Sequence, residues 1–274
     1  MRRVATLTLI VVTLGLAKGQ AADWPQLLGP RANGISSETG LLSAWPSGGP
    51  KVLWKKPIGT GYSAPSIRDG RLVLFHRIGN EEIVEALDPK TANPVWRHAY
   101  PTRYRDPFGY NNGPRCTPLL TEKCCFTFGA EGVLLCLDAA TGKPVWQRKT
   151  AEEFRVPEAF FGVGATPVLE GNLLIVMVGG QPNSTVVAFD KDTGKMVWQS
   201  AGRDRWQGKP TIGWAGEPLV RWRGYEKLAS YATPTLATIH GRRTLFCLTR
   251  QGLVSMDPKT GNVNFSRWFR CLLY

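Results

Sequence analysis

The sequence is poor in the residues that build metal sites and disulfide scaffolds. Its three histidines stand apart from one another and from the six cysteines, and the 274 residues contain no C-x-x-C pair. A structural zinc site needs a tetrahedral set of closely spaced Cys and His ligands, so we predict no metal. Six cysteines are also few for a disulfide scaffold of this length, and we interpret most of them as small buried residues.

Familiar catalytic phrases are missing as well. Neither H-E-x-x-H nor G-x-S-x-G occurs, which leaves metalloprotease and serine hydrolase activities without support. Residues Gly59 to Ala64 match the dinucleotide-binding phrase G-x-G-x-x-A, but Pro65 and a strand pattern follow where that phrase needs a helix. We therefore predict no catalytic residue, and we lean away from an enzyme while leaving that question open.

Long apolar runs are absent beyond the amino-terminal segment. The run from Val4 to Leu16 has about 13 residues, fewer than the roughly 20 that a membrane-spanning helix needs. Arginines precede this run and small residues follow it, so residues 1–22 are predicted to be a signal peptide. We expect a periplasmic or secreted protein with no transmembrane segment, and the first cysteine, Cys116, is too distant to carry a lipid anchor.

Acidic residues are fewer than basic ones. The formal charge is +13, and it falls to +10 without the predicted signal peptide. Because the basic residues are scattered along the chain, we interpret them as a solvated basic surface. An exported protein rarely meets nucleic acid, so we expect no nucleic-acid partner.

One phrase occurs four times along the chain. Its template is a small residue, an apolar residue, Asp, two variable residues, Thr, usually Gly, three variable residues and an aromatic residue. The residues that define the motif are Asp88 and Trp96; Asp138, Gly142 and Trp146; Asp190, Gly194 and Trp198; and Asp257, Gly261 and Phe265. Four copies of so specific a phrase indicate a repeat protein.

A second phrase lies upstream of each copy. Prolines precede the four aspartates by 23, 20, 23 and 23 residues, at Pro65, Pro118, Pro167 and Pro234. Both marks therefore belong to one unit, and successive aspartates lie 50, 52 and 67 residues apart. The longest spacing holds an insertion at residues 203–227, which we interpret as a partner-binding loop or as a cap over one rim.

Each unit has the pattern of four short strands separated by turn residues. The aspartate is expected to bond turn amides, and the glycine to take the positive φ that closes the hairpin between the third and fourth strands. In the first unit Ala92 stands at the glycine position, and we expect the positive φ to move to Asn93. The aromatic residue eight positions after each aspartate is expected to pack on the neighbouring unit.

The Asp-x-x-Thr-Gly-x-x-x-Trp phrase resembles the tryptophan-docking motif of the PQQ-like (quinoprotein-like) repeat family. That family includes quinoprotein dehydrogenases, the outer-membrane assembly propeller lipoprotein, and exported bacterial proteins whose mature start is similar to Asp23-Trp24-Pro25-Gln26. The resemblance covers residues 23–265, with Ala92 and Phe265 as departures from the motif. It implies an all-β fold, a β-propeller of four-stranded antiparallel blades, but no particular activity, because the family holds enzymes and binding modules alike.

This resemblance sets the expected domain organisation. A signal peptide (1–22) and an amino-terminal extension (23–50) precede a partial propeller at 51–274, with repeats at about 51–100, 101–150, 151–202 and 228–270. Residues Val52 to Lys56 have the pattern of a fourth strand whose first three partners should come from the far end of the chain. The sequence stops just after its fourth repeat, so we expect a truncated sequence and an incomplete ring of about four blades. The alternative is a small closed ring of four blades.

The resemblance also raises the question of a cofactor. A quinoprotein dehydrogenase needs a calcium-held quinone, pyrroloquinoline quinone (PQQ), and an aspartate base, and no residues here match those motifs. Cys124 and Cys125 are adjacent, like the vicinal disulfide that contacts the quinone in some quinoprotein alcohol dehydrogenases. They lie in a strand pattern, and we interpret them as ordinary strand residues. No cofactor is predicted; PQQ with calcium belongs only to the dehydrogenase alternative.

The segments that lead into each innermost strand are the candidate binding site. In a propeller these segments converge around the central channel. We expect a polar and aromatic channel mouth formed by Tyr62, Tyr110, Asn111, Asn112, Arg115, Phe161 and Tyr231, although the same residues also suit ordinary loop packing. The interpretation is an exported, non-catalytic scaffold that binds a protein or polymer; the alternatives are a PQQ-dependent alcohol or sugar dehydrogenase and an outer-membrane protein assembly factor.

Overall fold

The computed structural model describes residues 22–156, 161–180, 182–202, 230–249 and 252–268. The predicted signal peptide, except for Ala22, and the insertion at 203–227 lie outside the described residues.

The described chain forms four antiparallel sheets of four strands, each in chain order. The first sheet contains β1 (Ser66–Arg68), β2 (Arg71–Ile78), β3 (Glu81–Leu87) and β4 (Pro94–Pro101). The second contains β5 (Leu119–Leu120), β6 (Cys124–Phe128), β7 (Val133–Asp138) and β8 (Pro144–Lys149), followed by the short helix α1 (Thr150–Glu153). The third contains β9 (Val168–Glu170), β10 (Leu173–Gly180), β11 (Ser184–Asp190) and β12 (Met196–Ser200). The fourth contains β13 (Thr235–Ile239), β14 (Arg242–Thr249), β15 (Gly252–Met256) and β16 (Val263–Trp268).

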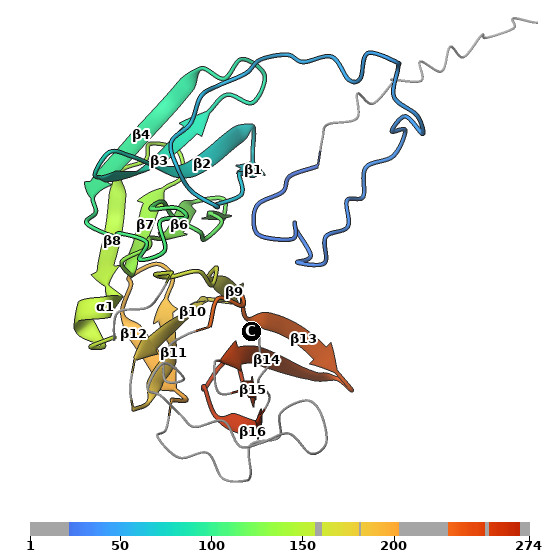
Figure 1. Ribbon diagram of the computed structural model, residues 1–274. Coiled ribbons are helices and arrows are strands. Elements are labelled where there is room, and N and C mark those ends of the chain that lie inside the picture. Colours follow the sequence, from blue (N-terminus) through green and yellow to red (C-terminus); the bar gives the residue numbers. More distant parts are fainter. Residues whose placement is uncertain (1–21, 157–160, 181, 203–229, 250–251, 269–274) are drawn as a thin grey trace, which may run out of the picture.

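The four sheets follow one another along an open arc (Figure 1). Strands β1, β9 and β13 lie toward the concave side of the arc, and β4, β8 and β12 lie toward its convex side. The predicted all-β fold of four-stranded blades is therefore confirmed, and the described blades form a partial ring and not a closed ring of four.

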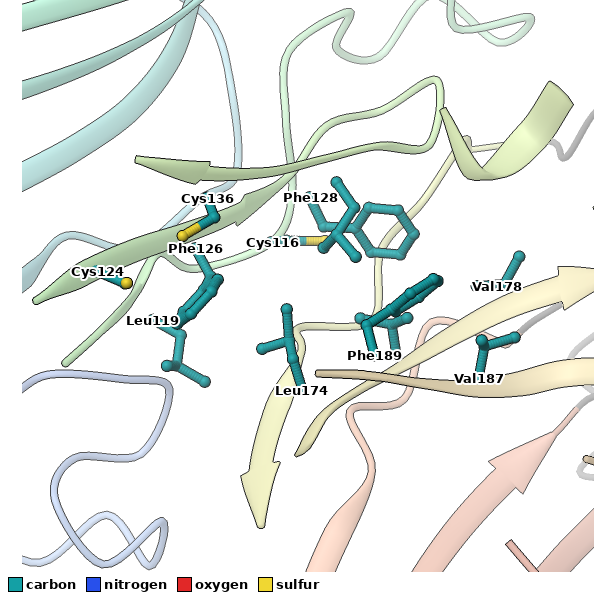
Figure 2. Packing of buried hydrophobic residues seen from close by; sticks show 12 residues of the cluster. Cys116, Leu119, Cys124, Phe126, Phe128, Cys136, Leu174, Val178, Val187 and Phe189 are labelled. Atoms are coloured by element: carbon teal, nitrogen blue, oxygen red, sulfur yellow. The ribbon is translucent and has the colours of Figure 1, made fainter. Parts of the chain in front are cut away.

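Apolar side chains fill the space between neighbouring sheets. Figure 2 shows the junction of the second and third sheets, where Phe126 and Phe128 of β6 meet Leu174 of β10 and Phe189 of β11. All four are fully buried. Burying a side chain of this size contributes about 1.5–3 kcal/mol, so a sheet with two apolar faces gains most of its stability from both neighbours. Similar clusters join the first sheet to the second and the third to the fourth.

The repeated aspartate closes each hairpin between the third and fourth strands. Asp138 Oδ1 accepts hydrogen bonds from the Thr141 amide (2.8 Å) and the Thr141 hydroxyl (2.7 Å). These bonds lower the pKa of Asp138 below its usual value, because they stabilise the carboxylate. The Gly142 amide then bonds to the Asp138 carbonyl (2.8 Å) with a φ of +69°, as the motif predicted.

The repeated tryptophan docks on this turn of the next sheet. The Trp96 indole of β4 donates to the Ala139 carbonyl (3.1 Å) and lies over Gly142, where a Cβ would come within 2.5 Å of the ring. The Trp146 indole bonds to Lys191 (2.9 Å) and the Trp198 indole to Pro258 (3.2 Å) in the same register. The predicted docking on the neighbouring unit is confirmed at these three junctions.

Phe265 occupies the equivalent place in the fourth sheet. It pairs with Ser255 across β15 and β16, as Trp96 pairs with Ala86 across β3 and β4. Half of its surface (50%) is exposed, because no further sheet covers it within the described residues.

The segment before the first sheet supplies a fourth docking indole. Trp54 donates to the Pro89 carbonyl (2.9 Å), the residue after Asp88, in the same register as the other three tryptophans. Val52 to Lys56 form no strand in the described structure, so the expected strand is wrong here while the placement of the tryptophan follows the repeat.

The first turn also corrects one expectation. Ala92 itself has a φ of +58°, and Asn93 does not take the positive angle. The reason is the bonding of the turn: the Ala92 amide reaches the Asp88 carbonyl (2.8 Å) as glycine does in the other units. These bonds place the positive φ at the fourth residue after the aspartate, whatever the side chain of that residue.

Candidate functional site

The loops that lead into the first strand of each sheet contact one another. The Tyr62 amide donates to the Pro114 carbonyl (2.8 Å), which joins the first unit to the second. The Phe161 amide donates to the Tyr231 hydroxyl (3.0 Å), which joins the third unit to the fourth. Neighbouring segments of the predicted mouth are therefore in contact at these two junctions.

Threonines beside the repeated prolines strengthen this inner line of contacts. The Thr117 amide donates to the Thr166 hydroxyl oxygen (3.1 Å), and the Thr166 amide donates to the Thr233 hydroxyl oxygen (3.0 Å). Each hydroxyl thus satisfies a backbone amide of the preceding unit. The threonines are visible in the sequence, but their hydrogen bonds could not be predicted from it, because these bonds depend on how closely neighbouring sheets approach.

Four aromatic rings from three units form a continuous cluster. Phe108 stacks on Tyr110 with ring centroids 6.0 Å apart and planes 18° from parallel. Phe161 lies 5.5 Å from Phe108 and 6.3 Å from Tyr110, and Tyr231 lies 5.5 Å from Phe161. We call Phe108, Tyr110, Phe161 and Tyr231 the aromatic rim.

A buried ion pair holds the loop that carries Phe108 and Tyr110. The Asp106 side chain is fully buried and bonds to the Arg115 guanidinium at 2.9 Å. The same carboxylate accepts the Phe108 amide (2.9 Å), and the Asp106 amide donates to the Asn112 side-chain oxygen (2.8 Å). Because both ends of the loop are tied to one carboxylate, its two rings are presented in a fixed orientation.

Arg115 connects this loop to the first unit. Its guanidinium lies over the rings of Tyr62 (5.8 Å) and Tyr104 (5.2 Å) and donates to the Asn111 carbonyl (3.0 Å). A cation over an aromatic face is stabilised by about 0.5–2 kcal/mol, depending on its burial. Arg115 therefore contacts two other members of the predicted mouth, Tyr62 and Asn111, and its guanidinium is occupied by these contacts and by Asp106.

The outer rings of this region are exposed to an unusual extent. Tyr110 is 69% exposed, Tyr62 is 61% exposed and Phe108 is 53% exposed. Exposed apolar side chains that occur singly need no explanation, but a group of rings held in place by buried polar contacts indicates an interaction surface.

A groove of about 900 Å³ adjoins the aromatic rim. Tyr104 and Gly162 line it next to the rim, while Met177 of β10 and Val163 contribute apolar surface. Its basic residues are Arg103, Arg105 and Lys149, and its acidic residues are Glu131 and Glu152. Lys149 pairs with Glu152 at 3.2 Å. The Arg103 backbone amide donates to the Glu131 carboxylate (2.9 Å), and the Arg105 guanidinium donates to the Asn80 side-chain oxygen (3.3 Å).

A buried carboxyl group lies beneath one wall of this groove. Glu82 of β3 accepts hydrogen bonds from the Tyr100 hydroxyl (2.6 Å) and the Ala130 amide (2.9 Å), and it thereby ties the first sheet to the second. Burial raises the pKa of Glu82, because removing the carboxylate from water costs more than these two bonds return. Gly129 leaves the space that Glu82 needs: a Cβ there would lie 2.1 Å from its oxygen.

The described residues do not fit a calcium-held quinone. Cys124 packs between the second and third sheets, while Cys125 packs between the first and second, so the two thiols lie on opposite faces of β6. Both are buried, and a disulfide between them would disrupt a paired strand. In the part of the chain that the structure describes, no three His, Cys, Asp or Glu side chains gather as a metal site.

Sequence reasoning missed three residues of the site. Asp106, Phe108 and Tyr104 lie in the connection between β4 and β5. Only the spacing Asp-Pro-Phe-Gly-Tyr gave a signal, since aspartate before a proline and a glycine favours a turn.

Comparisons with known proteins agree with the repeat. A family model described as outer membrane protein assembly factor BamB matches residues 80–267. Quinohemoprotein alcohol dehydrogenase from Comamonas testosteroni is similar in structure, with a TM-score of 0.58 and 17% identity over 90% of this chain and 41% of that chain. BamB from Moraxella catarrhalis has a TM-score of 0.47 and 19% identity over 77% of this chain and 53% of its own.

This chain therefore spans about half or less of the length of those structures. At such low identity the likeness to the dehydrogenase shows the fold alone. No curated protein matches the chain. Among the described residues, no helix has the length and apolar character to cross a membrane.

Proposed function

Because the chain belongs to the PQQ-like repeat family described by the outer membrane protein assembly factor BamB, we propose that it is an exported, non-catalytic β-propeller that binds a protein partner. The aromatic rim is the proposed contact surface. The observation that carries this proposal is the pair of exposed rings, Phe108 and Tyr110, fixed by the buried Asp106–Arg115 ion pair. Rigid, exposed aromatic residues are the groups that dominate protein interfaces.

A photo-crosslinking amino acid tests this surface directly. We place p-benzoylphenylalanine at Tyr110, and as a matched control at Val145 of β8, which is 51% exposed on the outer strand of the second sheet. We expect an adduct with one defined protein from position 110 and none from position 145 after irradiation of cells. Equal adducts at both positions, or adducts at 145 alone, would contradict a specific surface at the rim.

Outer-membrane protein assembly is the second candidate function, and the family match over residues 80–267 favours it. In that case the adduct at position 110 contains a subunit of the outer-membrane assembly machinery, identified by mass spectrometry. An adduct with an unrelated protein would leave the first proposal standing and reject this one.

The dehydrogenase alternative rests on the likeness of fold, and the positions of Cys124 and Cys125 count against it. Incubating the full chain with PQQ and calcium separates it from a binding scaffold. We expect no bound chromophore and no dye reduction with alcohols or sugars. A bound quinone that reduces a dye would overturn the non-catalytic proposal.

A further inference from the structure

Cys124 and Cys136 lie on the same face of two adjacent strands. In the register of β6 and β7, Cys124 pairs with Asp138 and Cys136 pairs with Phe126. The two cysteines are therefore diagonal neighbours, and because side chains alternate along a strand, they point to the same side of the sheet. Both belong to the cluster that packs against the third sheet, and Figure 2 shows them beside Phe126.

The two thiols are in direct contact. Cys136 donates a hydrogen bond to the sulfur of Cys124, and this bond lowers the pKa of Cys124 to about 7, against the opposing effect of burial. In the turn after β11, Asp192 raises this pKa and Lys191 lowers it. The same hydrogen bond raises the pKa of Cys136 well above its usual value. Near neutral pH the pair therefore keeps a proton on Cys136 and presents a thiolate at Cys124.

The other cysteines of the described chain lack these properties. Cys124 keeps 8% of its surface exposed, whereas Cys116, Cys125, Cys136 and Cys247 are 0% exposed. Burial raises the pKa of Cys125 and that of Cys247. Because the thiolate is the reactive form of cysteine, these two buried thiols are inert. Among the described cysteines, Cys124 is thus the one that a reagent can reach, and Cys136 is the one that contacts it.

The end of the strand leaves room for the two sulfurs to form a bond. A disulfide needs Cα atoms within about 7 Å of each other, and diagonal neighbours on adjacent strands lie close to this limit. Cys124 is the first residue of β6, and its amide donates to the Thr121 hydroxyl oxygen (2.9 Å) in the preceding turn. A small shift at this end of the strand brings the sulfurs together and keeps the pairing of Phe126 with Cys136.

From this arrangement we propose that Cys124 and Cys136 are a redox-active pair, which a low-molecular-weight or protein disulfide oxidises to an intrachain disulfide. The proposal is independent of the partner-binding function of the rim.

The reaction is a thiol–disulfide exchange in two steps. The Cys124 thiolate attacks one sulfur of the incoming disulfide, whose S–S bond breaks and releases one thiolate. The Cys136 thiol gives its proton to that thiolate and attacks the Cys124 sulfur, which forms the Cys124–Cys136 bond and releases the second thiolate. This thiolate takes up from water the proton that Cys124 had lost. The two cysteines lose two electrons, and the reagent gains them and leaves as two thiols.

Disulfide mapping on the full chain tests the proposal. The reduced protein is incubated with glutathione disulfide near neutral pH, the remaining thiols are alkylated after unfolding, and the chain is cleaved after its glutamates, which separates Cys124 from Cys136 at Glu131. We expect most of the chain to carry a Cys124–Cys136 linkage, located by fragmentation in a mass spectrometer, and Cys125 to be alkylated. A Cys124–Cys125 linkage, or no linkage to Cys136, would overturn the proposal.

The two adjacent cysteines give a matched pair of variants. Cys125→Ala, on the opposite face of β6, should still form the linkage, and Cys124→Ala should form none. In the folded parent, iodoacetamide should alkylate Cys124 at least about tenfold faster than Cys125. Circular dichroism establishes that each variant is folded, and the mapping of the parent decides the question for a variant that is not.

The hydrogen bond between the thiols can be measured separately. Cys136→Ala removes the donor, so the pH of half-maximal alkylation of Cys124 should rise from about 7 toward the ordinary value of 9.0. An unchanged pH profile in this variant, or equal rates of alkylation at Cys124 and Cys125 in the parent, would contradict the roles given to the pair.

Discussion

Two aspartates of the second unit show how the repeated and the unrepeated parts of the molecule differ. Asp138 and Asp106 each accept the backbone amide two residues ahead, so both close an Asx-type turn. Asp138 is half-buried, its motif recurs in all four units, and the Trp96 indole of the preceding sheet docks on its turn. Asp106 is buried, pairs with Arg115 and occurs once. The residues that recur in every unit hold the blades together, whereas the candidate binding site depends on residues that do not recur.

The largest effect is expected from the docking tryptophans, because they are buried between sheets. Trp198 is 8% exposed, whereas Phe265 at the equivalent place is 50% exposed. Trp198→Ala should lower the free energy of unfolding by about 3–5 kcal/mol, as measured by urea denaturation. Phe265→Ala should cost far less, and equal losses would show that the docking of the indole is not what stabilises the junction.

Breaking the unrepeated aspartate's ion pair is expected to come next. Arg115→Ala leaves the buried Asp106 carboxylate without its partner and should cost about 3 kcal/mol, at the lower end for such pairs because Arg115 keeps 10% of its side chain exposed. The rim loop should also lose protection, so we expect faster amide hydrogen exchange at Phe108. Unchanged exchange there would contradict the role given to this ion pair.

Two glycines with positive φ allow the cost of backbone strain to be measured apart from the cost of a steric clash. Gly142 and Gly171 both have positive φ, +69° and +58°, but only Gly142 lies under an indole; a Cβ on Gly171 meets nothing within 4 Å. Gly142→Ala should cost about 1–3 kcal/mol more than Gly171→Ala, which isolates the clash with Trp96. Similar costs for both variants would assign the whole effect to φ.

Glu82, whose carboxyl group is buried between the first and second sheets, should make the stability of the protein depend on pH. The pKa of Glu82 is raised in the folded protein above its ordinary value of 4.5. Its favourable contribution to the free energy of unfolding is therefore complete below pH 4.5, and it is lost as the pH rises through the raised pKa. Glu82→Gln removes this dependence, and the variant should become more stable relative to the parent as pH rises above about 4.5. Thermal unfolding across a pH series measures it; a constant difference would refute the assignment.

The smallest effect on stability is expected at the rim itself. Tyr110 is 69% exposed, and its ring lies beside Phe108 and Phe161, so Tyr110→Ala should change the free energy of unfolding by less than about 0.5 kcal/mol. With the crosslinking amino acid placed at Phe108 instead, which is 53% exposed, the same variant should abolish the partner adduct. A large loss of stability would mean that the rim is structural packing.

The repeat made most of the fold predictable from the sequence. Asp138, Gly142 and Trp146 recur with fixed spacing, and each does in the structure what its chemistry suggests. The positive φ was expected at Asn93, because asparagine tolerates it better than alanine. It is found at Ala92, because the hydrogen bonds of the turn fix which position takes it.

The site was predictable only in part. Propeller geometry predicts that the segments carrying Tyr110 and Phe161 lie close together, and their rings are 6.3 Å apart. Tyr62 is linked to the first of these segments through Arg115. Asp106 and Glu82 were missed, because a lone aspartate in a loop and a glutamate in a strand gain their roles from residues of another sheet. Such long-range partners leave no mark in a local pattern.

The docking of each indole on the following turn gives the chain a direction. The donor precedes its acceptor by 35 residues at Trp54 and by 43, 45 and 60 residues at the later junctions. A chain that leaves the ribosome or a translocation pore from its amino terminus thus always presents the indole before its turn arrives. Each new blade therefore brings its turn to an indole that has already been made, and the blades can assemble in order from the amino terminus.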